Sequence, residues 1–120
     1  MIFGENSKED MRMSNLGNEK KFWCVGVEKI REILTSDICE NSDVLAVLEF
    51  ENFDIELTDR GYSDGERHYD YFCCKKTDGK WHSFDSVDFG GKKPYEFSTD
   101  EELKADMRTQ LEKFLEKYNM

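Results

Sequence analysis

Two histidines and four cysteines are the residues with which this chain of 120 amino acids could carry out chemistry near neutral pH. The imidazole of histidine titrates in that range, and a cysteine thiolate is a strong nucleophile. His68 and His82 are expected far apart on one hairpin ladder, at a distance of roughly 20 Å or more for strands that rise about 3.4 Å per residue. They cannot share a site, so an enzyme would have to rely on His82 or on a cysteine.

The cysteines do not form a recognisable site. Cys24, Cys39, Cys73 and Cys74 contain no Cys-x-x-Cys pair, and the histidines are not spaced as zinc partners for them. Cys73 would lie diagonally across a sheet from His82, whereas catalytic thiols usually lie at a helix N-terminus or beside a positive charge. We expect reduced, mostly buried thiols in a cytoplasmic protein, and two disulfides in a secreted protein are the alternative.

Two loops superficially resemble ligand-binding motifs. Residues 90–93, Gly-Gly-Lys-Lys, lack the spacing of a P-loop and the parallel strand that precedes one. The acidic residues of the segment 59–66 do not alternate as they do in an EF-hand calcium loop. The sequence therefore predicts no catalytic residue, no metal site and no cofactor.

Acidic side chains dominate the composition. The chain has 27 acidic and 17 basic residues, which gives a formal net charge of −10. Repulsion by phosphates argues against direct binding of nucleic acid or anionic lipid. No apolar run approaches the roughly 20 residues that span a bilayer, and the N-terminal residues lack the pattern of a secretion signal, so we expect a cytoplasmic protein. The charge is concentrated, because residues 49–70 contain eight acids and only two bases.

The elements that must position these side chains form one domain over residues 21–120, preceded by an irregular or mobile arm over residues 1–20. Apolar residues at helical spacing predict a helix between residues 27 and 38. Residues 21–26 fit either a short strand or an extension of that helix, because Gly26 interrupts the apolar run.

Residues 44–58 have the alternating pattern of strands. The apolar residues occupy even-numbered positions up to Phe50 and odd-numbered positions from Phe53. A β-bulge near Glu51 and Asn52 would keep both apolar sets on one face, and a tight reversal would make two strands. The bulge is favoured because short hairpin turns usually contain glycine. The opposite face is then acidic and carries Glu49, Glu51, Asp54 and Glu56.

Residues 67–76 and 80–89 form the clearest hairpin of the sequence. Asp78-Gly79 suits a two-residue type I′ turn between them. The resulting register pairs Cys73 with Phe84. The preceding segment, residues 59–66, is expected to be a loop.

Only one face of this hairpin can pack on helices in a two-layer domain. We expect the buried face to be the one that carries Phe72 and Trp81. Tyr69, Tyr71 and Phe84 would then be partly exposed, as aromatic anchors of interfaces are. The alternative is that both faces are covered and the tyrosines belong to the core.

A C-terminal helix from about residue 99 to 118 is the strongest prediction. It starts with a capping box, in which Ser98 is the N-cap and Glu101 occupies the N3 position. An apolar stripe marks the face that packs on the sheet, and it consists of Leu103, Met107, Leu111, Phe114, Leu115 and Tyr118. The fold class is therefore α+β, a single antiparallel sheet of about four strands with this helix and a second helical segment packed against it.

The acidic strand face and the neighbouring tyrosines together predict a surface that binds a partner. Carboxylates would attract a basic partner, and exposed aromatic rings would anchor it. The predicted partner-binding residues are Glu49, Glu51, Asp54, Glu56, Asp59, Asp64, Glu66, Asp70, Tyr69, Tyr71 and Phe84. The alternative is a solvated strand face that only keeps the protein soluble.

In size and style the chain resembles bacterial immunity proteins of polymorphic-toxin and contact-dependent growth inhibition systems. The likeness rests on the run Glu49–Glu56, the hairpin from Tyr69 to Phe84, and the capped terminal helix from Ser98. It implies a non-enzymatic cytoplasmic protein that needs no cofactor. Such a protein binds and neutralises a cognate protein toxin with a basic surface, for example a nuclease. The alternatives are another acidic binding module (an adaptor or a DNA mimic) or an enzyme that uses His82 or a cysteine.

Overall fold

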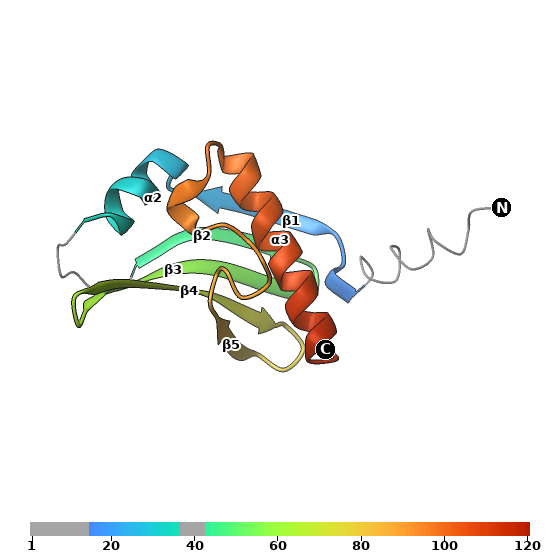
Figure 1. The fold of residues 1–120 in the computed structure, drawn as a ribbon. Coiled ribbons are helices and arrows are strands. Elements are labelled where there is room, and N and C mark those ends of the chain that lie inside the picture. Colours follow the sequence, from blue (N-terminus) through green and yellow to red (C-terminus); the bar gives the residue numbers. More distant parts are fainter. Residues whose placement is uncertain (1–14, 37–42) are drawn as a thin grey trace.

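The computed structural model describes residues 15–36 and 43–120 and contains one antiparallel sheet with helices packed on it (Figure 1). The predicted α+β class is confirmed. Predictions that fall on residues 1–14 and 37–42, including Cys39, lie outside the described residues. The five strands follow one another in space in chain order, and they are β1 (Glu19–Cys24), β2 (Asp43–Phe50), β3 (Phe53–Ser63), β4 (Glu66–Lys75) and β5 (Lys80–Phe84). The helices are α2 (Val27–Leu34), the 3-10 turn η1 (Pro94–Glu96) and α3 (Asp100–Lys117).

The sheet has one strand more than predicted, because residues 44–58 contain a tight reversal and not a bulge. Glu49 pairs with Asp54 across this reversal, which leaves Glu51 and Asn52 as a two-residue turn. The turn needs no glycine of its own because the segment before β1 supports it. The amides of Glu51 and Asn52 donate to the carbonyls of Asn18 and Leu16, each at 2.9 Å.

Two hairpin turns also differ from the prediction. The segment 59–66 is not a loop, since β3 and β4 run through it and are joined by Asp64-Gly65. Both turn residues have positive φ angles, 54° and 81°, as a type I′ turn requires. The other Asp-Gly pair, at positions 78–79, lies in a longer turn of residues 76–79. The register of β4 and β5 therefore shifts by two residues and pairs Tyr71, not Cys73, with Phe84.

The C-terminal helix and the helix before β2 form largely as predicted. Helix α3 covers residues 100–117, and its N-cap is Thr99 in place of Ser98, with the Thr99 hydroxyl accepting from the Glu102 amide at 3.2 Å. The predicted stripe is buried except for its last member, Tyr118, which is exposed. Helix α2 is shorter than predicted, and residues 19–24 before it form a strand.

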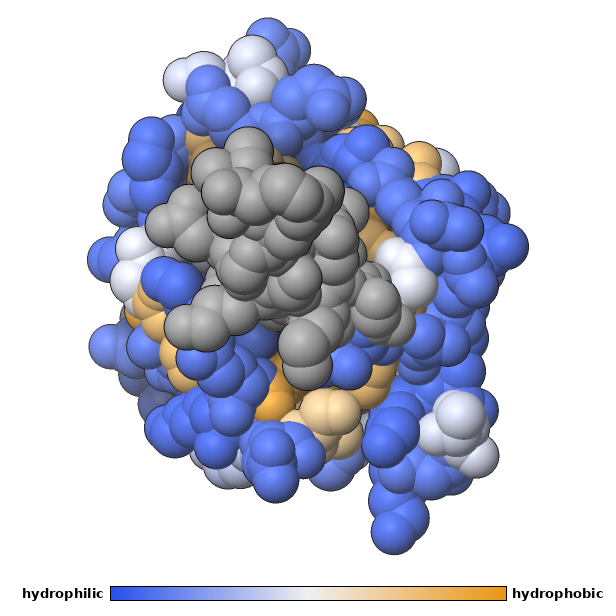
Figure 2. Space-filling model, turned by 90° about the vertical axis from the view of Figure 1, so that its right-hand side faces the viewer, coloured by the Kyte–Doolittle hydropathy of each residue, from blue (hydrophilic) through white to orange (hydrophobic). Residues whose placement is uncertain are grey.

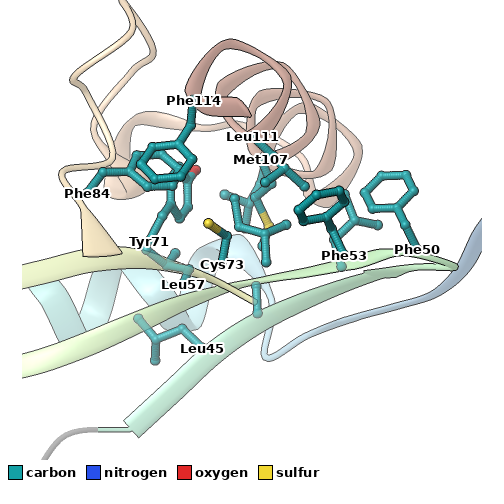
Figure 3. Close-up of a cluster of buried hydrophobic side chains, with 14 of the residues drawn as sticks. Leu45, Phe50, Phe53, Leu57, Tyr71, Cys73, Phe84, Met107, Leu111 and Phe114 are labelled. Atoms are coloured by element: carbon teal, nitrogen blue, oxygen red, sulfur yellow. The ribbon is translucent and has the colours of Figure 1, made fainter. Parts of the chain in front are cut away.

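The core lies between α3 and one face of the sheet (Figure 3). Phe84 stacks on Phe114 of α3 with ring centroids 4.7 Å apart, and Tyr71 packs edge-on against Phe84. Tyr71 is fully buried and Phe84 is 7% exposed. The expectation that these residues form an exposed patch is therefore wrong, and the physical reason is the strand pairing described below.

The core begins before the predicted domain boundary at residue 21. Leu16 is fully buried, and β1 starts at Glu19. Gly17 lets this segment approach the turn between β2 and β3, because its φ is +77° and a Cβ there would lie 2.5 Å from the Cβ of Glu51. Within the described residues, no helix is long and apolar enough to cross a membrane.

Candidate functional site

The sheet face that points away from α3 is the candidate site. Side chains alternate between the two faces of a strand, and Phe22, Phe50 and Tyr71 contact α3 through Lys104, Arg108 and Asp106. The opposite face, which we call the open face, follows from the strand pairing and comprises Lys21, Trp23, Val44, Val47, Glu49, Asp54, Glu56, Thr58, Asp70, Phe72, Cys74, Trp81 and Ser83.

The open face exposes large apolar side chains. Trp23 on β1 is 44% exposed, Val44 on β2 is 39% exposed, and Trp81 on β5 is 51% exposed. On the side of the molecule at which α3 ends, the described residues are mostly hydrophilic, with small separate hydrophobic patches (Figure 2). Both tryptophans of the chain are exposed on the open face.

Two cross-strand rows organise this surface. The register places Trp23, Val47, Glu56, Phe72 and Ser83 in one row that crosses all five strands. The next row consists of Lys21, Glu49, Asp54, Cys74 and Trp81. Each row combines apolar side chains with carboxylates, and the carboxylates lie toward the centre of the sheet.

Glu49 and Asp54 share a cation. The ammonium of Lys76, in the turn between β4 and β5, lies 3.3 Å from a Glu49 carboxylate oxygen and 3.4 Å from one of Asp54. Burial raises the pKa of the Asp54 carboxyl, and the nearby Lys76 opposes that shift. One ammonium thus offsets about half of the negative charge of this pair of acids.

Asp70 also has a cation of its own. A one-residue shift in the pairing of β3 and β4 occurs at Arg60, between Asp59 and Gly61. The Arg60 guanidinium lies 3.0 Å from a carboxylate oxygen of Asp70 and 5.7 Å from the ring centre of Phe72. Burial raises the pKa of Asp70, and the hydrogen bond from Arg60 opposes that shift.

Glu56 differs from the other carboxylates of the open face. It lies on β3, the middle strand, between Val47 of β2 and Phe72 of β4. Burial and then the neighbouring charge of Asp54 raise the pKa of its carboxyl. Among the described residues, no cation lies within ion-pair distance of Glu56.

The structure separates the other predicted acidic residues from this group. Asp59 is 1% exposed and forms a buried ion pair with Arg67 at 2.8 Å, so it does not lie on the surface as predicted. Glu51 lies in the turn after β2, where a side-chain oxygen accepts from the Asn18 amide at 3.0 Å. Asp64 and Glu66 lie at the exposed tip of the β3–β4 hairpin. Of the eight predicted acids, the open face brings together Glu49, Asp54, Glu56 and Asp70.

The predicted aromatic anchors lie on the covered face. The Tyr71 hydroxyl donates to Asp106 of α3 at 2.9 Å. Tyr69 is half-buried and packs edge-on against Tyr95 of η1, with ring centroids 6.4 Å apart. The exposed aromatic residues of the sheet are instead Trp23 and Trp81, which the sequence analysis placed in an undecided segment and in the core.

No family model, curated protein or solved structure matches this chain. The chemistry of the surface is therefore the basis on which a function can be proposed.

The described cysteines and histidines do not show the environment of a nucleophilic site. Cys24, Cys73 and Cys74 are free thiols, and burial raises the pKa of all three, that of Cys73 to about 12. Such thiols stay protonated and react poorly. His82 packs against Phe114 at a ring distance of 6.0 Å. In the part of the chain that the structure describes, no three His, Cys, Asp or Glu side chains are grouped so that they could hold a metal ion.

Proposed function

We propose that this chain is a non-enzymatic binding protein whose open face docks a partner protein. The observation that carries the proposal is the exposure of Trp23 and Trp81, 44% and 51%, at the two edges of one sheet face. Tryptophan is enriched among residues that dominate binding energy at interfaces. Contiguous exposed apolar patches are typical of interaction sites, and half-buried Val47 and Phe72 lie on the strands between the two tryptophans.

A toxin domain with a basic surface is the partner that fits this protein best, and the chain would then be its immunity protein. A net charge of −10 accelerates encounter with a positively charged partner, because long-range attraction steers association. The apolar side chains of the open face would supply the contacts that hold the complex. The resemblance to bacterial immunity proteins supports the same partner class.

The charge pattern of the open face favours a protein partner over mimicry of DNA. A DNA mimic presents free carboxylates in place of phosphates. Here Lys76 and Arg60 pair with Glu49, Asp54 and Asp70. The face therefore combines apolar anchors with local charge, which is the composition of a protein interface.

Affinity capture followed by a toxicity assay tests the proposal. The wild-type protein, the double variant Trp23→Ala/Trp81→Ala and the control Tyr95→Ala are used as baits in extracts of the native organism at low salt. Tyr95 is a suitable control because it is an aromatic residue on the covered side, in contact with Tyr69. All three baits are first checked for an unchanged far-UV circular dichroism spectrum.

The expected result is one basic protein that the wild type and Tyr95→Ala retain and the double tryptophan variant loses. Expressed alone, that protein should arrest growth, and co-expression of the wild type should restore growth. Retention by the double tryptophan variant would exclude the open face as the docking site. A retained partner that is harmless when expressed alone would exclude the immunity function.

A further inference from the structure

Glu56 is at the centre of the open face, and its carboxylate has no cation among the described residues. Its neighbours in the same cross-strand row are Val47 and Phe72, which are both apolar. A carboxylate in such surroundings loses hydration when a partner covers it, and an ion pair or hydrogen bonds must compensate for that loss. The open face thus carries a carboxylate to which no cation of the described residues is paired.

The molecule itself shows how a guanidinium can bind on this face. Arg60 lies 5.7 Å from the ring centre of Phe72 and 3.0 Å from the carboxylate of Asp70. An arginine is therefore held here by an aromatic ring and a neighbouring carboxylate together. The same ring also lies beside a second carboxylate, because Phe72 and Glu56 are directly paired across β3 and β4.

We infer that the partner inserts an arginine side chain onto Glu56, with the guanidinium against Phe72 and the aliphatic stem along Val47 and Trp23. This inference rests on the proposed function and names the chemistry of the partner's contact. Arginine fits better than lysine because its planar guanidinium can pair with both carboxylate oxygens and pack on an aromatic ring. It is also less strongly hydrated than an ammonium, so burying it costs less.

Glu56 would then determine specificity as well as affinity. A partner with an arginine at this position satisfies the carboxylate, whereas a partner with an apolar residue there buries the carboxylate unpaired. Discrimination between partners arises from that second, unfavourable case as much as from the favourable one. A protein that lacks this arginine should bind the open face weakly even if its shape fits.

The inference can be tested on the free protein with ethylguanidinium chloride as a probe for the arginine side chain. Ethylammonium chloride at equal ionic strength is the control cation, and Glu66 is the control carboxylate, since it is exposed at the β3–β4 hairpin tip. Carboxyl carbon NMR follows the pKa of each residue. A cation that binds the ionised form lowers the pKa, by about 0.3 when the probe concentration equals its Kd.

The expected result is a larger fall of the Glu56 pKa with ethylguanidinium than with ethylammonium, and no such difference at Glu66. The Phe72→Ala variant should lose the preference while keeping the fold. Equal shifts with both cations at Glu56, or an equal preference at Glu66, would overturn the inference.

A second measurement separates this inference from the proposed function. In a complex with the captured partner, Glu56→Gln should weaken binding about tenfold or more, whereas Glu66→Gln should leave it unchanged. If Glu56→Gln binds like the wild type while Trp23→Ala/Trp81→Ala does not, the arginine contact is refuted and the docking surface stands. If neither variant loses affinity, both proposals fail.

Discussion

The buried ion pair between Asp59 and Arg67 leads to a specific prediction about stability. The two groups lie 2.8 Å apart, and their side chains are only 2% and 8% exposed. The second carboxylate oxygen of Asp59 accepts from the Gly61 amide at 2.9 Å. Asp59→Ala removes both interactions, and it leaves the Arg67 charge in the interior without its carboxylate.

Breaking a buried pair in this way costs about 3–5 kcal/mol, because the guanidinium stays buried after its carboxylate at 2.8 Å has been removed. For 120 residues the entropy of unfolding is about 0.25 kcal/mol per kelvin, so Tm should fall by about 10–20 °C. Glu32→Ala is the matched control, since the Lys29–Glu32 pair is exposed and 3.5 Å long. The free energy of unfolding should change by less than about 0.5 kcal/mol in the control.

Urea unfolding followed by far-UV circular dichroism measures both variants. Fluorescence is less suitable because Trp23 and Trp81 are already exposed in the folded protein. The double variant Asp59→Ala/Arg67→Met should recover part of the lost stability, because it also removes the buried guanidinium whose carboxylate at 2.8 Å is gone. A cost below about 1 kcal/mol for Asp59→Ala, or no recovery in the double variant, would refute the reasoning.

Three further predictions concern the fold. Gly17→Ala should lower the free energy of unfolding by about 1–3 kcal/mol, which is more than Gly65→Ala should cost. Both glycines have a positive φ, but only at Gly17 would a Cβ collide with a neighbour. Equal losses of stability in urea unfolding would contradict this prediction. Tyr71→Phe should lower the free energy of unfolding by about 1–2 kcal/mol, since it removes the buried hydrogen bond to Asp106. The affinity for the partner should not change, and a loss of affinity would place Tyr71 in the interface. Stability should rise as the pH falls from neutral toward the ordinary carboxyl pKa values of 3.8 and 4.5, because a carboxyl whose pKa is raised by folding destabilises the folded state above that pKa. A fall in the urea midpoint over this range would contradict the prediction. The carboxyls with raised pKa are Asp54, Glu56, Asp70 and Asp106.

Local patterns in the sequence were sufficient to predict much of this fold. Helix α3 has its own cap and apolar stripe, so its limits were predicted to within a residue. The acidic face of β2 and β3 was also predicted, because alternation puts Glu49, Asp54 and Glu56 opposite the apolar side chains whether the chain bulges or reverses. That part of the candidate site follows from the alternation of side chains along a strand alone.

The face of β4 that is buried could not be predicted in this way. The type I′ turn at Asp64-Gly65, continued without a bulge, would pair Leu57 with Phe72 and bury Phe72. The one-residue shift at Arg60 pairs Leu57 with Tyr71 instead. Since a shift of one residue exchanges the two faces of a strand, it buries the tyrosine face and leaves Phe72 and Trp81 on the open face.

Interactions between distant segments explain the remaining differences. The turn at Glu51 and Asn52 depends on backbone carbonyls of residues 16 and 18. The shift at Arg60 occurs where Gly61 has a φ of +85° and the buried Asp59–Arg67 pair closes over it. The turn at Glu51 and Asn52 leaves no pattern in its own residues, whereas Gly61 beside the bulge is a local signal, since a glycine within a strand often marks a bulge.

One measurement tests most directly whether the open face is the docking surface. It is the affinity of the captured partner for the double variant Trp23→Ala/Trp81→Ala, measured by calorimetry and compared with the affinities for the wild type and for Tyr95→Ala. Two aromatic anchors that each contribute about 1.5–2 kcal/mol correspond to a loss of affinity of about 100-fold to 1,000-fold. We predict such a loss in the double variant and a change below about threefold in Tyr95→Ala. Equal affinity of all three proteins would contradict the central claim.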